Sequence, residues 1–205
     1  MAERKARADA LRNRETVLAA ADQLFARSAS PRGVSMDDIA AAAGVGKGTL
    51  FRRFGDRTGL IRAVFEARSE PLRQAVADGP APLGPAAAPR ERVPALLDAV
   101  LCFKLDHRHL SLALEEAGSG SPYQGAHYTW WHGILRESLE RLWGTEGAEG
   151  EGAAATDGDF AAHVLLAATR ADLVEQLVGR DGVTREGMRA QLAAFVGRVL
   201  GGRTA

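Results

Sequence analysis

The chain has 205 residues, of which 46% are hydrophobic and 25% are charged, and its formal net charge at pH 7 is zero. This apolar content is sufficient for a core and excludes a wholly disordered chain. No apolar run reaches the ~18–20 residues that cross a bilayer, and the charged N-terminus lacks the apolar stretch of a secretory signal. One cysteine, Cys102, excludes an intrachain disulfide framework and is expected to pack in the core. We therefore expect a cytoplasmic protein without membrane contact.

The zero net charge conceals an uneven distribution along the chain. Residues 1–68 contain 13 Lys and Arg against 8 Asp and Glu, whereas the remaining residues contain 13 against 18. A basic region attracts a polyanion, and an acidic region is repelled by one. The distribution predicts that the N-terminal part contacts nucleic acid and that the C-terminal part does not.

The first elements of the chain are predicted to be helical. Alanine and leucine dominate and β-branched residues occur singly, which favours helices over strands. A basic lead-in precedes apolar residues at helical spacing, which predict a helix over about residues 8–29. Breaks at residues 30–33 and 55–57 enclose two short helices, and a longer helix is expected over about residues 58–77, with Pro71 inside it.

The most informative stretch is SMDDIAAAAGVGKGTLFRRF, residues 35–54. Ser35 is a good N-cap, and Asp38 occupies the capping-box position three residues on. Gly44 supplies a residue that tolerates positive φ, and Gly46 can cap a second helix, Lys47 to Phe54. Leu50 lies on the apolar side of that helix, which leaves cations and a hydroxyl exposed. A short exposed helix with these groups fits the DNA major groove.

These residues resemble the motif of the TetR family of transcriptional regulators. The match runs from Ser35 through Ile39, Gly44 and Thr49 to Arg57, and by motif it covers roughly residues 10–68. Gly46, Phe51 and Arg53 depart from it, because Ser, Tyr and His are common there. The resemblance implies that DNA is contacted by Ser35, Lys47, Gly48, Thr49, Phe51, Arg52, Arg53 and Arg57, with Gly48 allowing close backbone approach and Arg57 meeting a phosphate.

The rest of the chain predicts a helical bundle. Residues 78–90 form a linker rich in Pro, Gly and Ala, and residues 144–158 form an acidic, Gly-rich loop. Apolar periodicity predicts helices over about residues 93–103, 109–116, 123–143, 159–178 and 184–200. The expected fold is all-α with about nine helices. It comprises an N-terminal three-helix DNA-binding domain with a helix-turn-helix, residues 1–57, joined to a larger bundle for ligand binding and dimerisation, residues 58–205.

Aromatic and imidazole side chains gather at the start of the helix predicted over residues 123–143. They could line an apolar cavity with a few polar groups, as the resemblance to a ligand-binding bundle implies, or they could fill the core. The predicted effector is an unidentified, largely apolar small molecule. Its expected contacts are Phe103, His107, Tyr123, His127, Tyr128, Trp131 and His163.

Metal binding and catalysis are not predicted. His107 and His109 are two residues apart, and His127 and His132 are five apart, so neither pair has the spacing of three or four that brings two ligands together on a helix. The chain has no nucleophile elbow, no phosphate-binding glycine loop after a strand and no paired-carboxylate signature. We expect no cofactor, no metal and no enzyme activity.

These observations together predict a ligand-responsive, homodimeric transcription factor. Two groove-reading helices related by two-fold symmetry would reach a pseudo-palindromic double-stranded operator, and an effector would release the repressor. The dimer is expected through the last two helices, where Ala167, Ala168 and Ala171 allow close approach and Phe195 adds apolar surface. Two alternatives stay open. One is a small-molecule enzyme or sequestering protein with an incidental basic region, and the other is a DNA-binding regulator whose bundle binds only protein.

Overall fold

The computed structural model describes residues 1–28, 31–117, 123, 125–146 and 151–201. Within these residues the chain is all-α as predicted, with no strand and with ten α-helices, nine of which have eight or more residues. No helix among them is long and apolar enough to span a membrane. The chain divides into two compact units, residues 1–70 with 107–118 and residues 71–106 with 119–205. The functional boundary between residues 57 and 58 stays a prediction.

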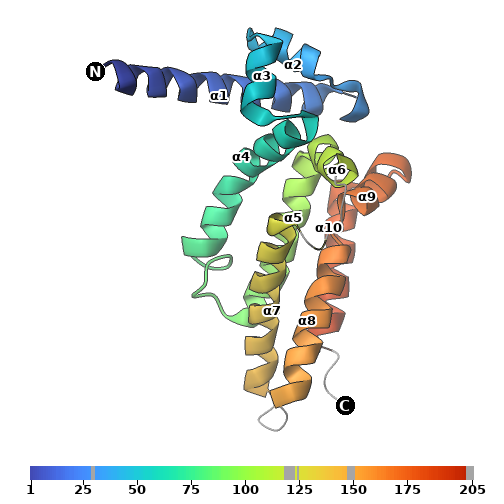
Figure 1. The fold of residues 1–205 in the computed structure, drawn as a ribbon. Helices are drawn as coiled ribbons and strands as arrows, with labels where there is room; N and C mark the ends of the chain where they lie inside the picture. The colour runs from blue at the N-terminus through green and yellow to red at the C-terminus, as the bar shows by residue number, and fades with distance from the viewer. Residues whose placement is uncertain (29–30, 118–122, 124, 147–150, 202–205) are drawn as a thin grey trace. The chain divides into compact units, whose positions relative to one another are not determined.

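The first unit is built around a long helix, α1, which packs against α2 and α6, while α2 packs against α3 (Figure 1). Its buried core includes Val17, Ala21, Phe25, Ile39, Leu50, Ile61 and Val64. The elements are α1 (Ala2–Arg27), η1 (Pro31–Gly33), α2 (Met36–Ala43), α3 (Lys47–Phe54), the beginning of α4 (Arg57–Asp78) and α6 (Arg108–Ala117).

The second unit is a helical bundle in which α5, α7, α8 and α10 run side by side (Figure 1). Helix α7 packs against α5 and α8, and α10 packs against α5. Its core includes Leu97, Val100, Leu101, Trp131, Leu135, Leu139, Leu165 and Val196. The elements are the end of α4, α5 (Pro89–Asp106), α7 (Ala126–Glu146), α8 (Glu151–Ala167), α9 (Ala171–Val174), the π-helix η3 (Glu175–Arg180) and α10 (Arg185–Gly201).

Two arginines connect segments of this bundle through their side chains. Arg189 of α10 donates to Asp98 of α5 through Nε at 2.7 Å and Nη2 at 2.8 Å. Arg92 is buried and donates from Nε to the Leu83 carbonyl at 3.0 Å and from Nη2 to the Val76 carbonyl at 3.1 Å. The predicted linker is therefore tied to α5 by a buried arginine.

Two predicted elements differ from the structure. The helix predicted over residues 159–178 ends at Ala167, where Thr169 donates its hydroxyl to the Leu166 carbonyl at 2.9 Å and the chain restarts as α9 and η3. The loop predicted over residues 144–158 is helical up to Glu146 and again from Glu151. The alanines after Glu151 favour helix and outweigh the acidic, Gly-rich character of the segment; residues 147–150 lie outside the described part.

Candidate nucleic-acid interface and aromatic cluster

Helix α2 begins at the predicted capping box. The Ser35 hydroxyl accepts from the Asp38 backbone N–H at 3.1 Å, and the Asp38 carboxylate accepts from the Ser35 backbone N–H at 3.0 Å. The Ser35 hydroxyl also donates to Asp38 Oδ2. These hydrogen bonds stabilise the carboxylate and lower the pKa of Asp38 below its ordinary value. Ser35 therefore has a structural role at the start of α2, beside its predicted contact with DNA.

A three-residue turn then sets the direction of α3. Gly44 ends α2 with φ 64° and ψ 30°, and its N–H and that of Val45 bond to the carbonyls of Ala41 and Ala40. Only glycine adopts this left-handed conformation without a penalty. Gly46 is the N-cap of α3, as predicted, and Leu50 is 1% exposed beneath the helix. Local capping and one buried leucine thus fix α3 on α2.

The remaining surface of α3 is exposed and basic. The exposed residues include every DNA contact predicted on this helix, namely Lys47, Gly48, Thr49, Phe51, Arg52 and Arg53. A Cβ built on Gly48 meets no atom within 4 Å, so the space above this residue is open to a partner. The helix is held from one side by Leu50, and the opposite side is chemically suited to phosphates and base edges.

The predicted DNA contact Lys47 has an acidic partner within the first unit. Lys47 Nζ lies 2.6 Å from Asp37 Oδ1, and both side chains are more than half exposed. Such exposed pairs contribute about 0–1 kcal/mol, so a phosphate can replace Asp37 at little cost.

Arg57 is held more firmly. Its Nε donates to the Val34 carbonyl at 3.0 Å, and its guanidinium lies 5.9 Å from the Phe25 ring centroid. Sequence reasoning missed this internal role, because the motif places Arg57 by analogy and carries no signal for a partner 23 residues away. Arg57 ties the first turn of α4 to the chain before α2.

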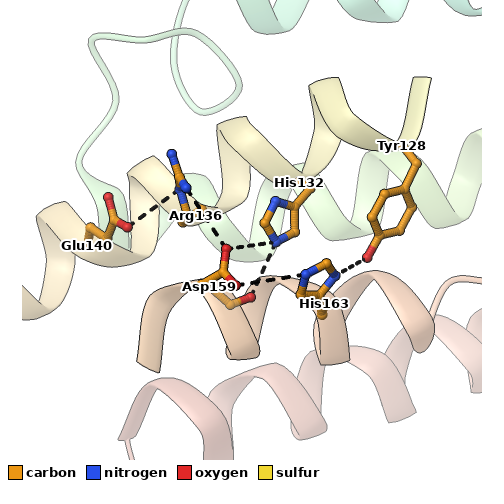
Figure 2. Close-up of polar contacts among 6 residues, drawn as sticks. All are labelled: Tyr128, His132, Arg136, Glu140, Asp159 and His163. Carbon is orange, nitrogen blue, oxygen red and sulfur yellow. Dashed lines mark hydrogen bonds and ion pairs between the residues drawn. The ribbon is translucent and has the colours of Figure 1, made fainter. Parts of the chain in front are cut away.

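The aromatic cluster lies in the second unit, between α7 and α8. Tyr128 Oη is 2.5 Å from His163 Nδ1, and their rings stack with centroids 5.8 Å apart. Tyr123 meets both rings edge-on and is 53% exposed. Figure 2 shows Tyr128 and His163 with His132 and Asp159. The structure thus brings together three of the seven residues predicted to contact the effector.

Two further predicted contacts lie deeper in the same unit. Trp131 is 3% exposed within the core and packs edge-on against Trp130, with centroids 4.8 Å apart. His127 meets Trp131 edge-on at 6.3 Å. Burial, with Lys104 and Arg73 nearby, lowers the pKa of His127 to about 4, so its imidazole is neutral at pH 7. The burial of Trp131 favours the core interpretation for this residue.

The last two predicted contacts lie elsewhere. Phe103 is half-buried on α5, and His107 belongs to the first unit, where its Nδ1 is 3.9 Å from Asp22 Oδ1. An open cavity of about 350 Å³ exists in the second unit, but none of the predicted contacts lines it. Its lining residues are Ala88, Pro89, Arg90, Arg141, Leu142 and Gly144.

The residues predicted at the dimer seam differ in exposure. Ala167 is exposed and Phe195 is half-buried against the bundle core, whereas Ala171 is 1% exposed. Phe160 on α8 is 71% exposed, which is unusual for a large aromatic side chain. A large apolar side chain is therefore exposed on α8, and Ala171 belongs to the interior of the second unit.

The fold and α3 define an all-α protein with a helix-turn-helix, the architecture of a DNA-binding regulator. Residues 17–64 match the family described as bacterial regulatory proteins, tetR family. The resemblance to the TetR family that the sequence motif indicated is confirmed by this match over residues 17–64.

Solved structures share the fold over nearly the whole chain. A proposed TetR-family transcriptional regulator from Rhodococcus sp. is 20% identical, with a TM-score of 0.62 over 92% of this chain and 99% of that chain. A proposed fatty acid metabolism regulator from Clostridium perfringens is 17% identical, with a TM-score of 0.62 over 93% and 99%. A TetR-like transcriptional regulator from Rhodococcus sp. RHA1 is 23% identical, with a TM-score of 0.57 over 93% and 97%. A search of curated proteins finds no match.

Proposed function

We propose that this protein is a cytoplasmic, homodimeric transcriptional repressor that binds a pseudo-palindromic operator and is released by a small-molecule effector, without enzyme activity. The observation that carries the proposal is the division of α3 into one buried residue and a basic, open surface. Leu50 is 1% exposed, while Lys47, Thr49 and Arg52 are exposed along the same helix. Cations and a hydroxyl on a projecting helix bind phosphates and guanine edges.

Gly48 offers a test in which stability and DNA binding change in opposite directions. Glycine inside a helix costs about 1 kcal/mol relative to alanine, and a Cβ at Gly48 meets nothing within 4 Å. Gly48→Ala should therefore raise the melting temperature and weaken DNA binding, because the new methyl group occupies the space of the approaching backbone. Gly133→Ala on α7, where a Cβ also meets nothing within 4 Å, is the matched control. Both variants are compared by melting curves and by gel shift with the DNA flanking the protein's own gene. Unchanged DNA binding by Gly48→Ala would contradict the proposed surface.

Alanine substitutions of Arg52 and Arg57 should weaken DNA binding in different ways. Arg52→Ala should cost about 1–3 kcal/mol on the specific site and relax sequence preference. If the Arg57 guanidinium also reaches a phosphate, Arg57→Ala should weaken binding to all DNA sequences. It should also reduce the slope of log K against log salt concentration by about one. It should also lower stability, because Arg57 Nε donates to the Val34 carbonyl. Arg27→Ala, an exposed cation at the end of α1, is the matched control for charge. Equal losses on specific and random DNA for Arg52→Ala would refute base reading.

The effector is proposed to contact the aromatic cluster around Tyr123, Tyr128 and His163. This site combines flat rings with hydrogen-bonding edges, which suits a largely apolar compound. Its deeper part holds a neutral His127 near Lys104 and Arg73, so local charge there is positive although the region as a whole is acidic. A compound that binds should raise the melting temperature and weaken the gel shift of the wild type. Tyr123→Ala removes an exposed ring and should reduce both responses without unfolding the protein.

A further inference from the structure

Two imidazoles and one carboxylate lie together between α7 and α8, and one of the imidazoles, His163, also belongs to the aromatic cluster. His132 comes from α7, and Asp159 and His163 lie one turn apart on α8. One nitrogen of each imidazole and one carboxylate oxygen all lie within 4.8 Å of one another. We propose that His132, Asp159 and His163 bind one divalent transition-metal ion of the zinc type. This proposal goes beyond the proposed regulatory function and does not depend on it.

The separations are close to those of a coordinated set. His132 Nε2 lies 3.5 Å from Asp159 Oδ1, and His163 Nε2 lies 3.9 Å from Asp159 Oδ2 (Figure 2). Tetrahedral zinc with bonds of about 2.0–2.1 Å places neighbouring donor atoms about 3.3 Å apart. Each pair of donor atoms must therefore move closer together, by an amount between a few tenths of an ångström and about 1.5 Å. Side-chain rotation about existing single bonds supplies this movement without moving the helices.

A second layer of contacts orients the proposed ligands. His163 Nδ1 is 2.5 Å from the Tyr128 hydroxyl, and when Nδ1–H donates to that oxygen, Nε2 carries the lone pair toward Asp159. Imidazoles that bind metals commonly donate their other ring N–H in this way. Arg136 bridges the carboxylates of Asp159 and Glu140, at 3.9 Å and 3.5 Å. The tyrosine and the arginine restrict the two ligands on α8 before an ion arrives.

The exposure of the group permits an ion to enter. The side chain of His132 is 14% exposed, that of His163 41% and that of Asp159 50%. Three protein ligands leave a fourth tetrahedral position for water or another ligand. Nitrogen donors select late first-row ions such as Zn²⁺ over Mg²⁺ and Ca²⁺, which prefer oxygen ligands.

The competing interpretation is a hydrogen-bonded polar cluster that binds no ion. In that arrangement His132 Nε2 bonds to the Asp159 backbone carbonyl, at 3.3 Å, and Arg136 neutralises the carboxylate. The two interpretations differ in the effect that replacing Arg136 should have on zinc binding. A cation beside the site opposes a divalent ion, so Arg136→Gln should tighten zinc binding by roughly 3- to 10-fold. A cluster without an ion predicts no saturable binding in either protein.

The test is a Zn²⁺ titration of the untagged, full-length protein after treatment with chelator. We expect saturable binding of one ion per chain, displacement by chelator, and no such binding of Mg²⁺. At a free Zn²⁺ concentration 100 times the Kd, the unfolding equilibrium should shift by about 100-fold toward the native state. Because neither DNA nor effector is present, failure of this titration and failure of the proposed repressor are separate results.

Substitutions of the proposed ligands test where the ion binds. His132→Gln and His163→Gln should abolish saturable binding, and Tyr128→Phe should weaken it by about 10- to 100-fold. Asp159→Asn is nearly isosteric and half-exposed, so it tests the site even if a histidine variant fails to fold. His109→Gln, a histidine of the first unit, is the matched control and should bind as the wild type does. Absence of one-per-chain binding by the wild type, or wild-type affinity in Asp159→Asn, would overturn the proposal.

Discussion

Acid should destabilise the second unit through His127. The folded-state pKa of this imidazole is lowered from 6.5 to about 4, first by burial and then by Lys104 and Arg73. Between these two values the unfolded chain binds a proton that the folded chain does not, so stability increases with pH in this window. The contribution of neutral His127 is complete above about pH 6.5 and is lost as pH falls toward 4.

The magnitude follows from the two pKa values. On lowering the pH from 8 to 5, the unfolded imidazole becomes almost fully protonated while the folded one stays largely neutral. The difference corresponds to about 2 kcal/mol of stability lost at pH 5, and about 3 kcal/mol by pH 4. This loss is a large part of the free energy of unfolding of a typical domain.

Urea unfolding at pH 8, 6.5 and 5 measures the loss. His127→Gln removes the titration and keeps a polar side chain, so its pH dependence should be smaller than that of the wild type by about 2 kcal/mol over the same range. An identical pH dependence in wild type and His127→Gln, or an NMR titration of His127 near pH 6.5, would refute the reasoning.

Substitutions at four other positions test the fold and the assembly. Ser35→Ala should cost about 1 kcal/mol in urea unfolding through loss of the N-cap, and Ser35→Asp should retain most of the stability. Arg92→Met should cost about 2 kcal/mol or more in the same assay, because the buried Val76 carbonyl and the partly buried Leu83 carbonyl lose their donor; a variant as stable as wild type would disprove that role. Ala171→Glu should unfold the bundle, since Ala171 is 1% exposed, whereas Ala193→Glu on the exposed side of α10 should give a folded monomer by sedimentation. A folded dimer in Ala193→Glu would exclude a seam at that side of α10.

The sequence predicted the first unit most closely where its signals are local. The capping box of Ser35 and Asp38, the left-handed Gly44 and the N-cap Gly46 all act within a few residues, and α3 spans the predicted Lys47–Phe54. Each signal is a backbone requirement that few residue types satisfy. For this reason no knowledge of the rest of the molecule was needed to place the exposed surface of α3.

Predictions in the second unit were weaker because they depend on how helices are paired. The spacing of four residues between Asp159 and His163 is present in the sequence, but spacing along one helix does not reveal that His132 lies beside them. His132 joins that pair through the packing of α7 against α8, across 27 residues of chain. The buried position of Trp131 likewise follows from helix packing, since an aromatic residue at the same spacing can line a cavity or fill a core.

Arg57 has an internal role in the structure beside its proposed contact with DNA. The family resemblance assigns it to a phosphate, while its Nε donates to the Val34 carbonyl and its guanidinium lies near the Phe25 ring. Both partners belong to the segments that precede α2, so Arg57 connects the start of α4 to the region that positions the helix-turn-helix. A guanidinium has five N–H donors in a planar fork, so the bond to the Val34 carbonyl uses only part of its hydrogen-bonding capacity. Lysine at this position would keep the charge but lose the fork, so an arginine here suits the internal role of residue 57 and its proposed contact with a phosphate.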